Sequence, residues 1–546
     1  MSNRFSTFPT YQKAIAKVHL GSCGVDQKKL DKPIIAVVNS WNEIVTGHVH
    51  LRVLADQVKQ SITDAGAVPL EFNTIAICDG IAQGHAGMKY SLASRELIAD
   101  SVEAMVKGHG IFDGMVMLGS CDKIVPGMLM AAARINIPTI MITGGPMKHH
   151  ITPKENKAAR QEFIHGKIDE QKLLDVSAEY YTGAGVCPFF GTANTMCEIA
   201  ETLGLTLPNV STVLALSDEQ KKLTTEAGRT IVNLVKKDIK PLDILTKEAF
   251  ENAITVTLAM GGSLNSTLHI PAIAAECGIP ISLDDFDRIS RNTPLNTRIC
   301  PNSKIYATGD LDTVGGLKTV MNELRSILHT DCLTVNGHTI GENIADAKPA
   351  DGEIIRPITN PFEREGGIAV LYGNLAPKGS VVKCSAIPED QWIFEGPAMV
   401  FDSEEDCTDA AYAHKIPDGT AVIIRYEGPS GGPGMREMHR ATEILAGIPG
   451  VAIITDGRFS GASAGISVGY LSPEAYAGGP IGLVQNGDII KINIPKRKLE
   501  WCVSEDTAAK RRTTFQPVVK DVNSNFLHLY REISEDASKG AVRKKF

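Results

Sequence analysis

Long hydrophobic runs and an excess of positive charge are both missing from this sequence. No apolar stretch approaches the roughly 20 residues that a membrane-spanning helix needs, and the first residues do not form a charged-then-apolar signal segment. The 55 Lys and Arg residues against 63 Asp and Glu residues give a formal net charge of −8, which favours neither nucleic acid nor an anionic membrane as a partner. We therefore expect a cytoplasmic protein with no membrane or nucleic-acid partner.

Regularly spaced cysteines and nucleotide-binding motifs are missing as well. The 11 cysteines are scattered without a CxxC pair, which argues against a disulfide framework, a closed zinc finger and the compact cysteine motif of an electron-transfer cluster. Neither GxxxxGK[ST] nor GxGxxG occurs, so nucleotide binding has little support. Most of the cysteines are expected to be small buried hydrophobic residues, and only those beside polar turn residues are candidates for chemistry.

The first third of the chain alternates strand and helix patterns. A chain of 546 residues is too long for one ordinary core, so at least two large domains are expected. Strands that alternate with helices predict an α/β domain with a doubly wound, mostly parallel sheet covered on both faces. The predicted strands are 34–39, 72–78, 115–118 and 139–143, and the predicted helices between them are 50–65, 91–107 and 128–135.

The middle and the last third of the chain follow other patterns. Residues 161 to 328 are mostly helical in pattern, with a Gly-rich interruption at 181–195. From residue 365 onward, short apolar or alternating runs separated by Gly and Pro predict the strands of a second, β-rich domain. The segment 347–353 is the expected linker, so the two predicted domains are residues 1–350 and 351–546.

Two thiol–carboxylate pairs follow predicted strands of the first domain. Cys78 directly precedes Asp79, and Cys121 directly precedes Asp122 and Lys123. Ligands of such sheets bind beyond the carboxyl ends of the strands, where these pairs are expected to meet. A thiol is a soft ligand for iron or zinc, and a carboxylate is a hard ligand for magnesium. Either pair alone fits an ordinary loop, but two pairs at equivalent positions favour a metal site.

Three other segments contain polar residues in Gly-rich surroundings. Cys187 lies in a turn before a predicted helix, and three cysteines would leave one iron of a cubane cluster open to act as a Lewis acid. Glu427 and Glu437 flank a Gly/Pro loop, for which a solvated surface turn is the alternative interpretation. Ser460 lies in a loop after the strand pattern at 451–454, where an ordinary turn residue is the alternative.

Five long motifs resemble the signatures of one enzyme family. They are FNTIAICDGIAQGHAGM at 72–88, SLASRELIADSVE at 91–103, CDKIVPGMLMA at 121–131, YEGPSGGPGMREM at 426–438 and TDGRFSG at 455–461. The chain resembles the dihydroxy-acid and phosphogluconate dehydratase family over nearly its whole length. Members of this family remove water from small polyhydroxy acids to give 2-keto acids. The resemblance implies an α/β N-terminal domain, a C-terminal β-barrel-like domain and a homodimer.

The resemblance also implies roles for individual residues. The implied iron–sulfur ligands are Cys121 and Cys187, with Cys78 as the candidate for the third. The other implied residues are the Mg²⁺ ligands Asp79, Asp122 and Glu437, the carbamate-bearing Lys123, which would add an oxygen ligand, and the general base Ser460. One branch of the family, with a [2Fe–2S] cluster, carries a cysteine in a Pro-Cys-Asn segment. The corresponding stretch here is 45–48, VTGH, which favours [4Fe–4S] with Cys78 and leaves [2Fe–2S] open.

Two substrate classes remain open at this stage. The segments 47–51 and 91–103 favour the dehydration of 2,3-dihydroxy-3-methylbutanoate and 2,3-dihydroxy-3-methylpentanoate in valine and isoleucine biosynthesis. The segments 80–84 and 187–194 resemble phosphogluconate dehydratases, so a phosphogluconate or other sugar-acid dehydratase is the alternative. Leu264 departs from the Thr that is usual in the family. A non-catalytic iron–sulfur redox or sensor protein is the alternative from a different class.

Overall fold

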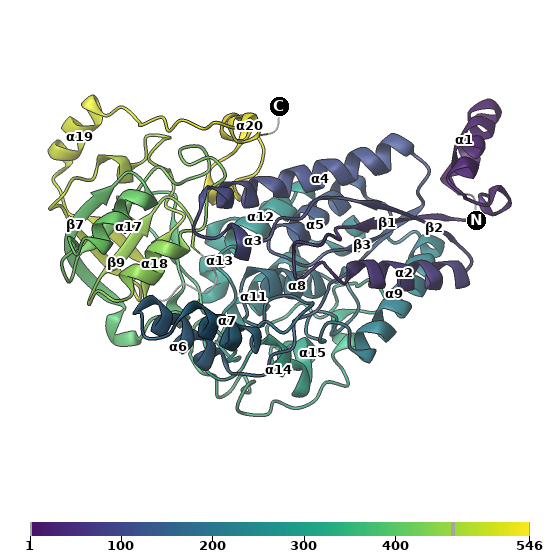
Figure 1. The fold of residues 1–546 in the computed structure, drawn as a ribbon, viewed down its shortest axis with the longest axis horizontal. Coiled ribbons are helices and arrows are strands. Elements are labelled where there is room, and N and C mark those ends of the chain that lie inside the picture. Colours follow the sequence, from purple (N-terminus) through teal and green to yellow (C-terminus); the bar gives the residue numbers. More distant parts are fainter. Residues whose placement is uncertain (1–2, 460–464, 545–546) are drawn as a thin grey trace.

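Two β-sheets, one in each half of the chain, organise the molecule (Figure 1). The computed structural model describes residues 3–459 and 465–544. Within these ranges a four-stranded sheet lies in the first third of the chain and an eight-stranded sheet in the last third. Helices from the middle of the chain fill the space between the two sheets.

The first sheet is parallel throughout and has the strand order β2-β1-β3-β4. Its strands are β1 (Ile34–Asn39), β2 (Val68–Asn73), β3 (Gly114–Leu118) and β4 (Thr139–Ile142). Every residue of β1, β3 and β4 is buried, as continuous apolar runs predict. The strand order reverses between β1 and β3, and the carboxyl ends of two such strands form the switch point at which open α/β sheets bind ligands.

Helices cover both faces of this sheet, which confirms the predicted doubly wound arrangement. On one face α4 (Lys89–His109) packs against α5 (Ile124–Ile135), and on the other α2 (Leu51–Asp64) packs against α9 (Asp218–Lys237) (Figure 1). The ends of α2 and α4 lie close to those predicted from the apolar periodicity, because buried apolar residues recur at helical spacing along α2 and along the second half of α4.

The second strand differs from its prediction. β2 covers Val68–Asn73 rather than 72–78, because it pairs with β1 from Ile34↔Val68 to Asn39↔Asn73 and the two strands end together. The apolar residue Ile75 therefore lies beyond the sheet and is 44% exposed. The segment after β2 carries Cys78 past the sheet to the start of the short helix α3 (Asp79–Ala82).

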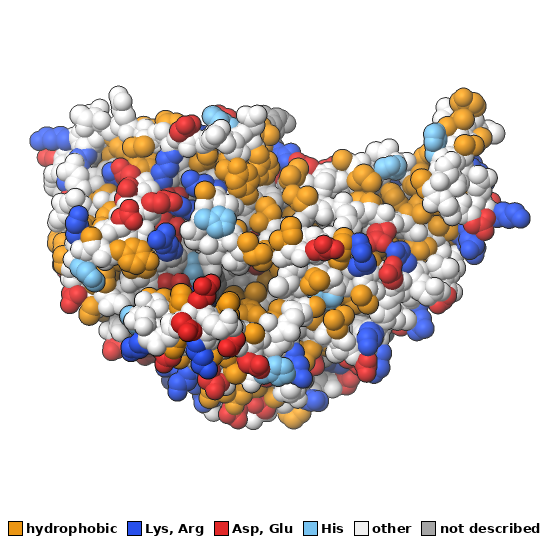
Figure 2. Space-filling model, in the orientation of Figure 1, with side chains coloured by type: hydrophobic (Ala, Val, Ile, Leu, Met, Phe, Trp, Pro, Cys, Tyr) orange, Lys and Arg blue, Asp and Glu red, His pale blue; other side chains and the backbone are white. Residues whose placement is uncertain are grey.

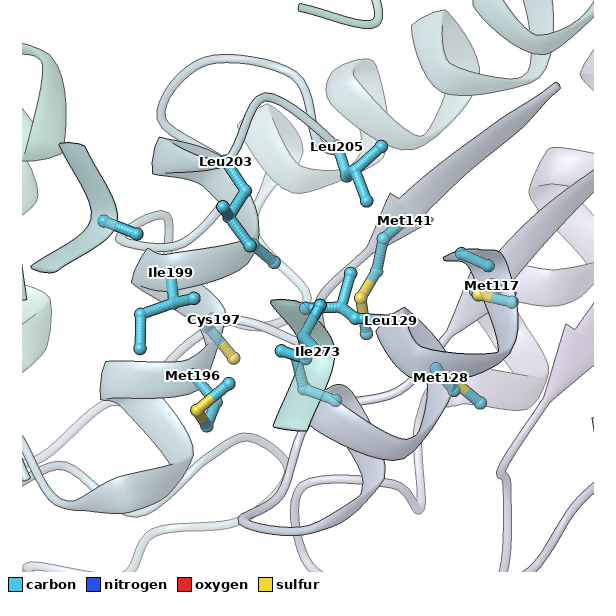
Figure 3. Close-up of a cluster of buried hydrophobic side chains, with 14 of the residues drawn as sticks. Met117, Met128, Leu129, Met141, Met196, Cys197, Ile199, Leu203, Leu205 and Ile273 are labelled. Atoms are coloured by element: carbon cyan, nitrogen blue, oxygen red, sulfur yellow. The ribbon is translucent and has the colours of Figure 1, made fainter. Parts of the chain in front are cut away.

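The helices between the two sheets form a buried layer. It includes α8 (Thr192–Thr202), α11 (Lys247–Ala259) and α12 (Ser266–Glu276), and every residue of α8 is buried. Figure 3 shows sulfur-containing and aliphatic side chains of α5, α8 and α12 packed with those of the sheet, among them Met117, Met128, Leu129, Met141, Met196, Cys197 and Ile273. Cys197 is thus one of the ordinary buried thiols that the sequence predicts.

The second sheet forms a barrel-like structure, as predicted. Its strands are β5 (Ala369–Leu371), β6 (Ser380–Val382), β7 (Ile393–Phe401), β8 (Ala421–Ile424), β9 (Ala452–Thr455), β10 (Ile466–Gly469), β11 (Ile489–Asn493) and β12 (Lys498–Trp501). In the order β12-β11-β7-β8-β9-β10-β6-β5, a bridge between Tyr372 and Lys498 joins the two outer strands. One face of β8 and β9 lines the barrel interior, and the other packs on α17 (Glu404–Tyr412) and α18 (His439–Leu445).

The end of the chain returns to the first domain. α20 (Asn525–Ile533) packs on α4 above the junction of the two sheets (Figure 1). Beyond α20, the carbonyl oxygens of Gly540 and Ala541 each accept a hydrogen bond of 3.0 Å from Arg95 of α4. Among the helices that the structure describes, none combines the length and the apolar character required to cross a membrane.

Candidate functional site

Three carboxylates from distant parts of the chain converge at the junction of the two domains. Asp79 begins α3, Asp122 follows β3, and Glu437 lies in the loop between β8 and α18. One oxygen of each carboxylate lies within 4.8 Å of the other two. Such a set of hard oxygen donors can bind a divalent cation such as Mg²⁺.

The amine of Lys123 lies among these carboxylates. Its Nζ is 2.8 Å from Asp79 Oδ2, 3.2 Å from Glu437 Oε1 and 3.5 Å from Asp122 Oδ2. Burial and Arg458 act to lower the pKa of Lys123, but the three carboxylates outweigh them and raise it. Lys123 and Arg458 together do not balance the three carboxylates: burial, Asp79 and Glu437 raise the pKa of Asp122 to about 7 despite the attraction of the two cations. A further positive charge is therefore favoured at this position.

A second group of polar residues fixes Glu437. Arg458 Nη1 donates to Glu437 Oε1 and, at 3.1 Å, to Asn265 Oδ1. Asn265 Nδ2 donates to the same Glu437 oxygen at 2.8 Å, and the Tyr470 hydroxyl donates to Asn265 Oδ1 at 2.9 Å. Burial alone would raise the pKa of Glu437, but Arg458 and Lys123 outweigh burial and lower it. Glu437 is thus held as a carboxylate in one orientation, as metal ligands usually are.

Three thiols lie beside the carboxylates. Cys78 and Cys121 directly precede Asp79 and Asp122, and Cys187 lies in the loop before α8. Burial, Asp122 and the neighbouring thiols together raise the pKa of Cys121 well above its ordinary value and that of Cys187 to about 12. Such thiols stay protonated unless a cation stabilises the thiolate. The three cysteines therefore suit soft metal ligation rather than a nucleophilic role.

The loop after β1 supports Cys121. His48 Nε2 accepts a hydrogen bond of 3.1 Å from the backbone N–H of Cys121, and His48 Nδ1 lies 2.9 Å from the carbonyl oxygen of Ser40. Burial lowers the pKa of His48 to about 4, so the ring is neutral and Nε2 remains an acceptor. A Cβ atom on Gly47 would lie 2.8 Å from Cys121 Sγ. Glycine at this position therefore makes room for the thiol.

The site has a partly exposed side and a buried side. Cys78, Asp79, Asp122 and Cys187 are partly exposed, whereas Lys123 and Glu437 are buried. Figure 2 shows a hollow in the surface between the barrel and α3, the helix that begins with Asp79.

Profiles for the two domains of one enzyme family match this chain. The dihydroxy-acid/6-phosphogluconate dehydratase N-terminal profile matches residues 32–343, and the corresponding C-terminal profile matches residues 353–541. The chain belongs to the dihydroxy-acid/6-phosphogluconate dehydratase family. The N-terminal match contains the three thiols, Asp79, Asp122 and Lys123, and the C-terminal match contains Glu437.

Curated relatives in the dehydratase family are similar to the chain over almost its full length. The dihydroxy-acid dehydratase of Caldicellulosiruptor saccharolyticus is 48% identical over 545 residues, which cover 97% of this chain and 98% of the relative. That of Methanothermobacter thermautotrophicus is 46% identical, with coverage of 97% and 98%. That of Aquifex aeolicus is 45% identical, with 97% of each chain covered. The family resemblance inferred from the motifs is thus confirmed.

Most of the predicted site residues lie together in this dehydratase. The residues that the structure brings into one region are Asp79, Asp122, Lys123, Glu437, Cys78, Cys121 and Cys187. Ser460 lies outside the described residues. Glu427, the other carboxylate of the Gly/Pro loop, does not join the site. It accepts hydrogen bonds from Arg436 at 2.9 Å and Lys520 at 2.8 Å in a separate buried charge cluster.

Sequence reasoning missed four supporting residues, namely His48, Asn265, Arg458 and Tyr470. Asn265 and Arg458 stand in Gly-rich segments, where a polar residue among glycines is a usable signal. His48 and Tyr470 carry no such signal, because their roles depend on Cys121 and Asn265, which are remote in sequence.

Proposed function

We propose that this family member is a cytoplasmic dihydroxy-acid dehydratase. It would convert 2,3-dihydroxy-3-methylbutanoate and 2,3-dihydroxy-3-methylpentanoate to 2-keto acids, as steps of valine and isoleucine biosynthesis. The observation that carries the proposal is the direct adjacency of thiol and carboxylate donors in Cys78-Asp79 and Cys121-Asp122 at the switch point of the parallel sheet. Relatives that bear this name are 45% and 48% identical across almost their whole length, which supports this substrate class.

Magnesium is the hard cation that we assign to Asp79, Asp122 and Glu437. Their oxygens lie within 4.8 Å of one another, and carboxylates are the ligands that Mg²⁺ prefers. A carbamate on Lys123 would replace the ammonium at the centre of the set by an anionic oxygen ligand. The excess of negative charge among the carboxylates supports the assignment of a divalent cation.

An iron–sulfur cluster is the soft metal group that we assign to Cys78, Cys121 and Cys187. Gly47 leaves the space beside Cys121 Sγ without a further thiol, so Cys78 supplies the third. Three cysteines favour a [4Fe–4S] cluster with one open iron, and [2Fe–2S] is the alternative. When bound, the cluster and Mg²⁺ would act as Lewis acids that stabilise negative charge on the substrate oxygens and assist loss of the 3-hydroxyl.

Ser460 is the residue to which we assign removal of the C2 proton of the substrate. Arg458, two positions earlier in the sequence, is anchored at Glu437 and Asn265, so the described chain reaches the carboxylates just before Ser460. Positive charge near a serine hydroxyl lowers its pKa and favours its use as a general base. Loss of the proton and of water gives an enol, which tautomerises to the 2-keto acid.

Anaerobic purification and a substrate panel test this proposal. We expect a brown protein that forms 2-keto acids from the two branched-chain dihydroxy acids with a kcat/KM at least about 10-fold above that for 6-phosphogluconate. A preference for the sugar acid would contradict the proposed substrate class. A brown protein that dehydrates no member of the panel would instead support a redox or sensor function.

A homodimer is the assembly that we propose for this enzyme. The helix α1 (Thr10–Ser22) buries none of its residues and projects from the body (Figure 1). Tyr11, Ile15 and Val18 are spaced for one helical face and are 73%, 41% and 59% exposed. A helix of 13 residues is marginal in water by itself, so contact with a second copy would stabilise it. Light scattering should give the mass of a dimer, and a monomer at micromolar concentration would contradict the proposal.

A further inference from the structure

His269 lies behind the carboxylates on the first turns of α12. Its side chain is fully buried. Asn265, which binds Glu437, precedes it by four residues, and the His269 N–H donates to the Asn265 carbonyl at 3.0 Å. Residues four apart share one face of a helix, so His269 and Asn265 extend toward the same region. The positive charges of Lys123 and Arg458 both act on the His269 ring, which agrees with this placement.

The tautomer of His269 follows from its contact with Arg95. Arg95 Nη1 lies 3.3 Å from His269 Nδ1, and a guanidinium can only donate. Nδ1 is therefore an acceptor, and the hydrogen of the neutral ring is on Nε2. Arg95 is itself fixed, because Nη2 donates to Glu96 Oε1 at 2.9 Å and to the carbonyls of Gly540 and Ala541 at 3.0 Å each. His269 thus presents an N–H donor on the side away from Arg95.

Two buried donors near the carboxylates lack an acceptor among the residues that the structure describes. They are His269 Nε2 and Arg458 Nη2. The other nitrogens of Arg458 are in use: Nε donates to the Met435 carbonyl at 2.5 Å, and Nη1 donates to Asn265 and Glu437. Buried donors are rarely left unsatisfied in folded proteins. Both side chains lie close enough to Lys123 to interact with its charge, so the two donors indicate acceptor oxygens near Lys123 that are not part of the described chain.

We propose that His269 Nε2–H and Arg458 Nη2–H form a binding seat for a carboxylate-type oxyanion beside Lys123. A carboxylate offers acceptor oxygens to both donors, and its charge suits the guanidinium. The inference rests on the proposed function, because it takes the carboxylate cluster as the working site. It adds two residues that select and orient an anion there.

Two groups can supply the carboxylate-type oxyanion. One is a carbamate on Lys123: the ammonium gives up a proton to water, the neutral amine attacks CO₂, an N–C bond forms, and a second proton leaves the nitrogen, with no oxidant or reductant involved. The other is the carboxylate of the substrate itself. The carbamate and the substrate carboxylate would each place a negatively charged oxygen near His269 Nε2 and Arg458 Nη2. The experiment must therefore distinguish which of the two groups binds there.

A pair of substitutions at His269 isolates the Nε2–H donor. In His269→Asn the amide oxygen reaches the place of Nδ1 and still accepts from Arg95, but the Nε2 donor is lost. In His269→Gln the longer side chain brings an amide N–H to the place of Nε2. His269→Asn is therefore the test and His269→Gln the rescue control. Iron content and thermal unfolding of both variants report any general structural effect.

Two probes of the metal-loaded enzyme distinguish the sources. The first is the ¹³C NMR signal of a carbamate after equilibration with [¹³C]bicarbonate, without substrate. The second is the Kd of the product 3-methyl-2-oxobutanoate, measured by calorimetry together with KM and kcat. If the carbamate occupies the seat, His269→Asn lowers its signal about 10-fold, as expected for one lost charge-assisted hydrogen bond. If the substrate does, the same variant raises the product Kd and KM about 10-fold and leaves the carbamate signal unchanged. His269→Gln recovers most of either loss.

Three results would overturn the inference. The first is a His269→Asn enzyme with unchanged carbamate signal and unchanged product Kd, because the donors would then face only bound water. The second is an equal loss in both variants with lower iron content or thermal stability, which would assign His269 a structural role alone. The third is a wild-type enzyme with neither a carbamate signal nor product binding. Failure of the proposed function is a separate result, because the carbamate measurement uses no substrate and does not depend on whether the enzyme dehydrates a dihydroxy acid.

Discussion

Cys121, Asp122 and Lys123 are consecutive in the chain, yet their side chains have different partners. The Cys121 sulfur packs against Gly47, and its backbone N–H donates to His48. Asp122 and Lys123 extend into the carboxylate cluster instead. A single turn after β3 thus delivers a soft donor, a hard donor and an amine to one site, so a substitution at any of the three should have a distinct effect.

Replacing a cluster thiol should remove the cluster. We predict that Cys121→Ser and Cys187→Ser each lose iron and activity, because a serine oxygen is a hard ligand that binds iron–sulfur clusters poorly. Cys78→Ser should lower the iron content and shift the absorption spectrum. Cys502→Ser, at an exposed thiol of the barrel domain, is the matched control and should behave as wild type. Wild-type iron content and rate in Cys121→Ser would contradict the assignment.

Removing the acceptor of the Cys121 N–H should loosen the cluster site. We predict that His48→Ala lowers the free energy of unfolding by about 1–3 kcal/mol, the cost of a buried donor without a partner, and that the purified variant retains less iron. In His48→Gln the amide oxygen can take the place of Nε2, so iron retention should recover in part. Equal iron retention in wild type and both variants, measured after anaerobic gel filtration, would show that His48 does not position Cys121.

At the scale of elements, Asp456, the residue directly after β9, holds the loop between β8 and α18 in place. The carboxylate of Asp456 accepts backbone hydrogen bonds from Tyr426 at 3.1 Å, Glu427 at 2.9 Å and Ala475 at 2.9 Å. All of these groups are buried. Glu437 lies in the same loop, so Asp456 fixes the position of a carboxylate that it does not touch.

Asp456 should therefore matter for stability and for magnesium. We predict that Asp456→Ala lowers the free energy of unfolding by about 2–4 kcal/mol, because three buried N–H groups lose their acceptor. Denaturant titration measures this loss. The variant should also need more Mg²⁺ for half-maximal activity, while Asp456→Asn, which keeps one oxygen, should be intermediate. An Asp456→Ala enzyme with unchanged stability would refute the role of this carboxylate as the anchor of the loop.

The elements also show how far the sequence alone leads. Helices such as α2 and α4 and the strand β1 are predictable, because each encodes its own apolar pattern. The start of β2 is not, because its register is set by pairing with β1 rather than by the apolar residues at 75 and 77. The same division holds in the site: Cys121, Asp122 and Lys123 are neighbours in the chain. The hydrogen bond between Asn265 and Glu437, in contrast, joins residues 172 positions apart.

At the scale of the whole molecule, neither half of the chain holds a complete site. Asp79, Asp122 and Lys123 come from the α/β domain, whereas Glu437 and Arg458 come from the barrel domain. The C-terminal segment ties the halves together through the hydrogen bonds of Arg95 to the carbonyls at 540 and 541. Catalysis by either domain alone is therefore not expected.

Ser460 should be needed for turnover but not for assembly of the site. We predict that Ser460→Ala keeps its iron, Mg²⁺ and substrate affinity but loses at least ~10²-fold in kcat, the low end for a general base. It should also stop exchange of the substrate C2 hydrogen with heavy water, if wild type shows this exchange. Ser463→Ala, three positions further along the sequence, is the matched control. A Ser460→Ala enzyme close to the wild-type rate would mean that another group takes the proton.

In the proposed function, a soft thiol set and a hard carboxylate set act together in one dehydration. The most direct test follows 2-keto acid formation from 2,3-dihydroxy-3-methylbutanoate by the anaerobic enzyme while a chelator removes Mg²⁺ and iron is measured in the same samples. We predict that activity disappears while the iron content stays full, and that it returns when Mg²⁺ is added back. In Glu437→Gln this return should need a higher Mg²⁺ concentration, because one hard ligand loses its charge. Full activity in samples shown to contain no magnesium would contradict the joint action of the two ligand sets.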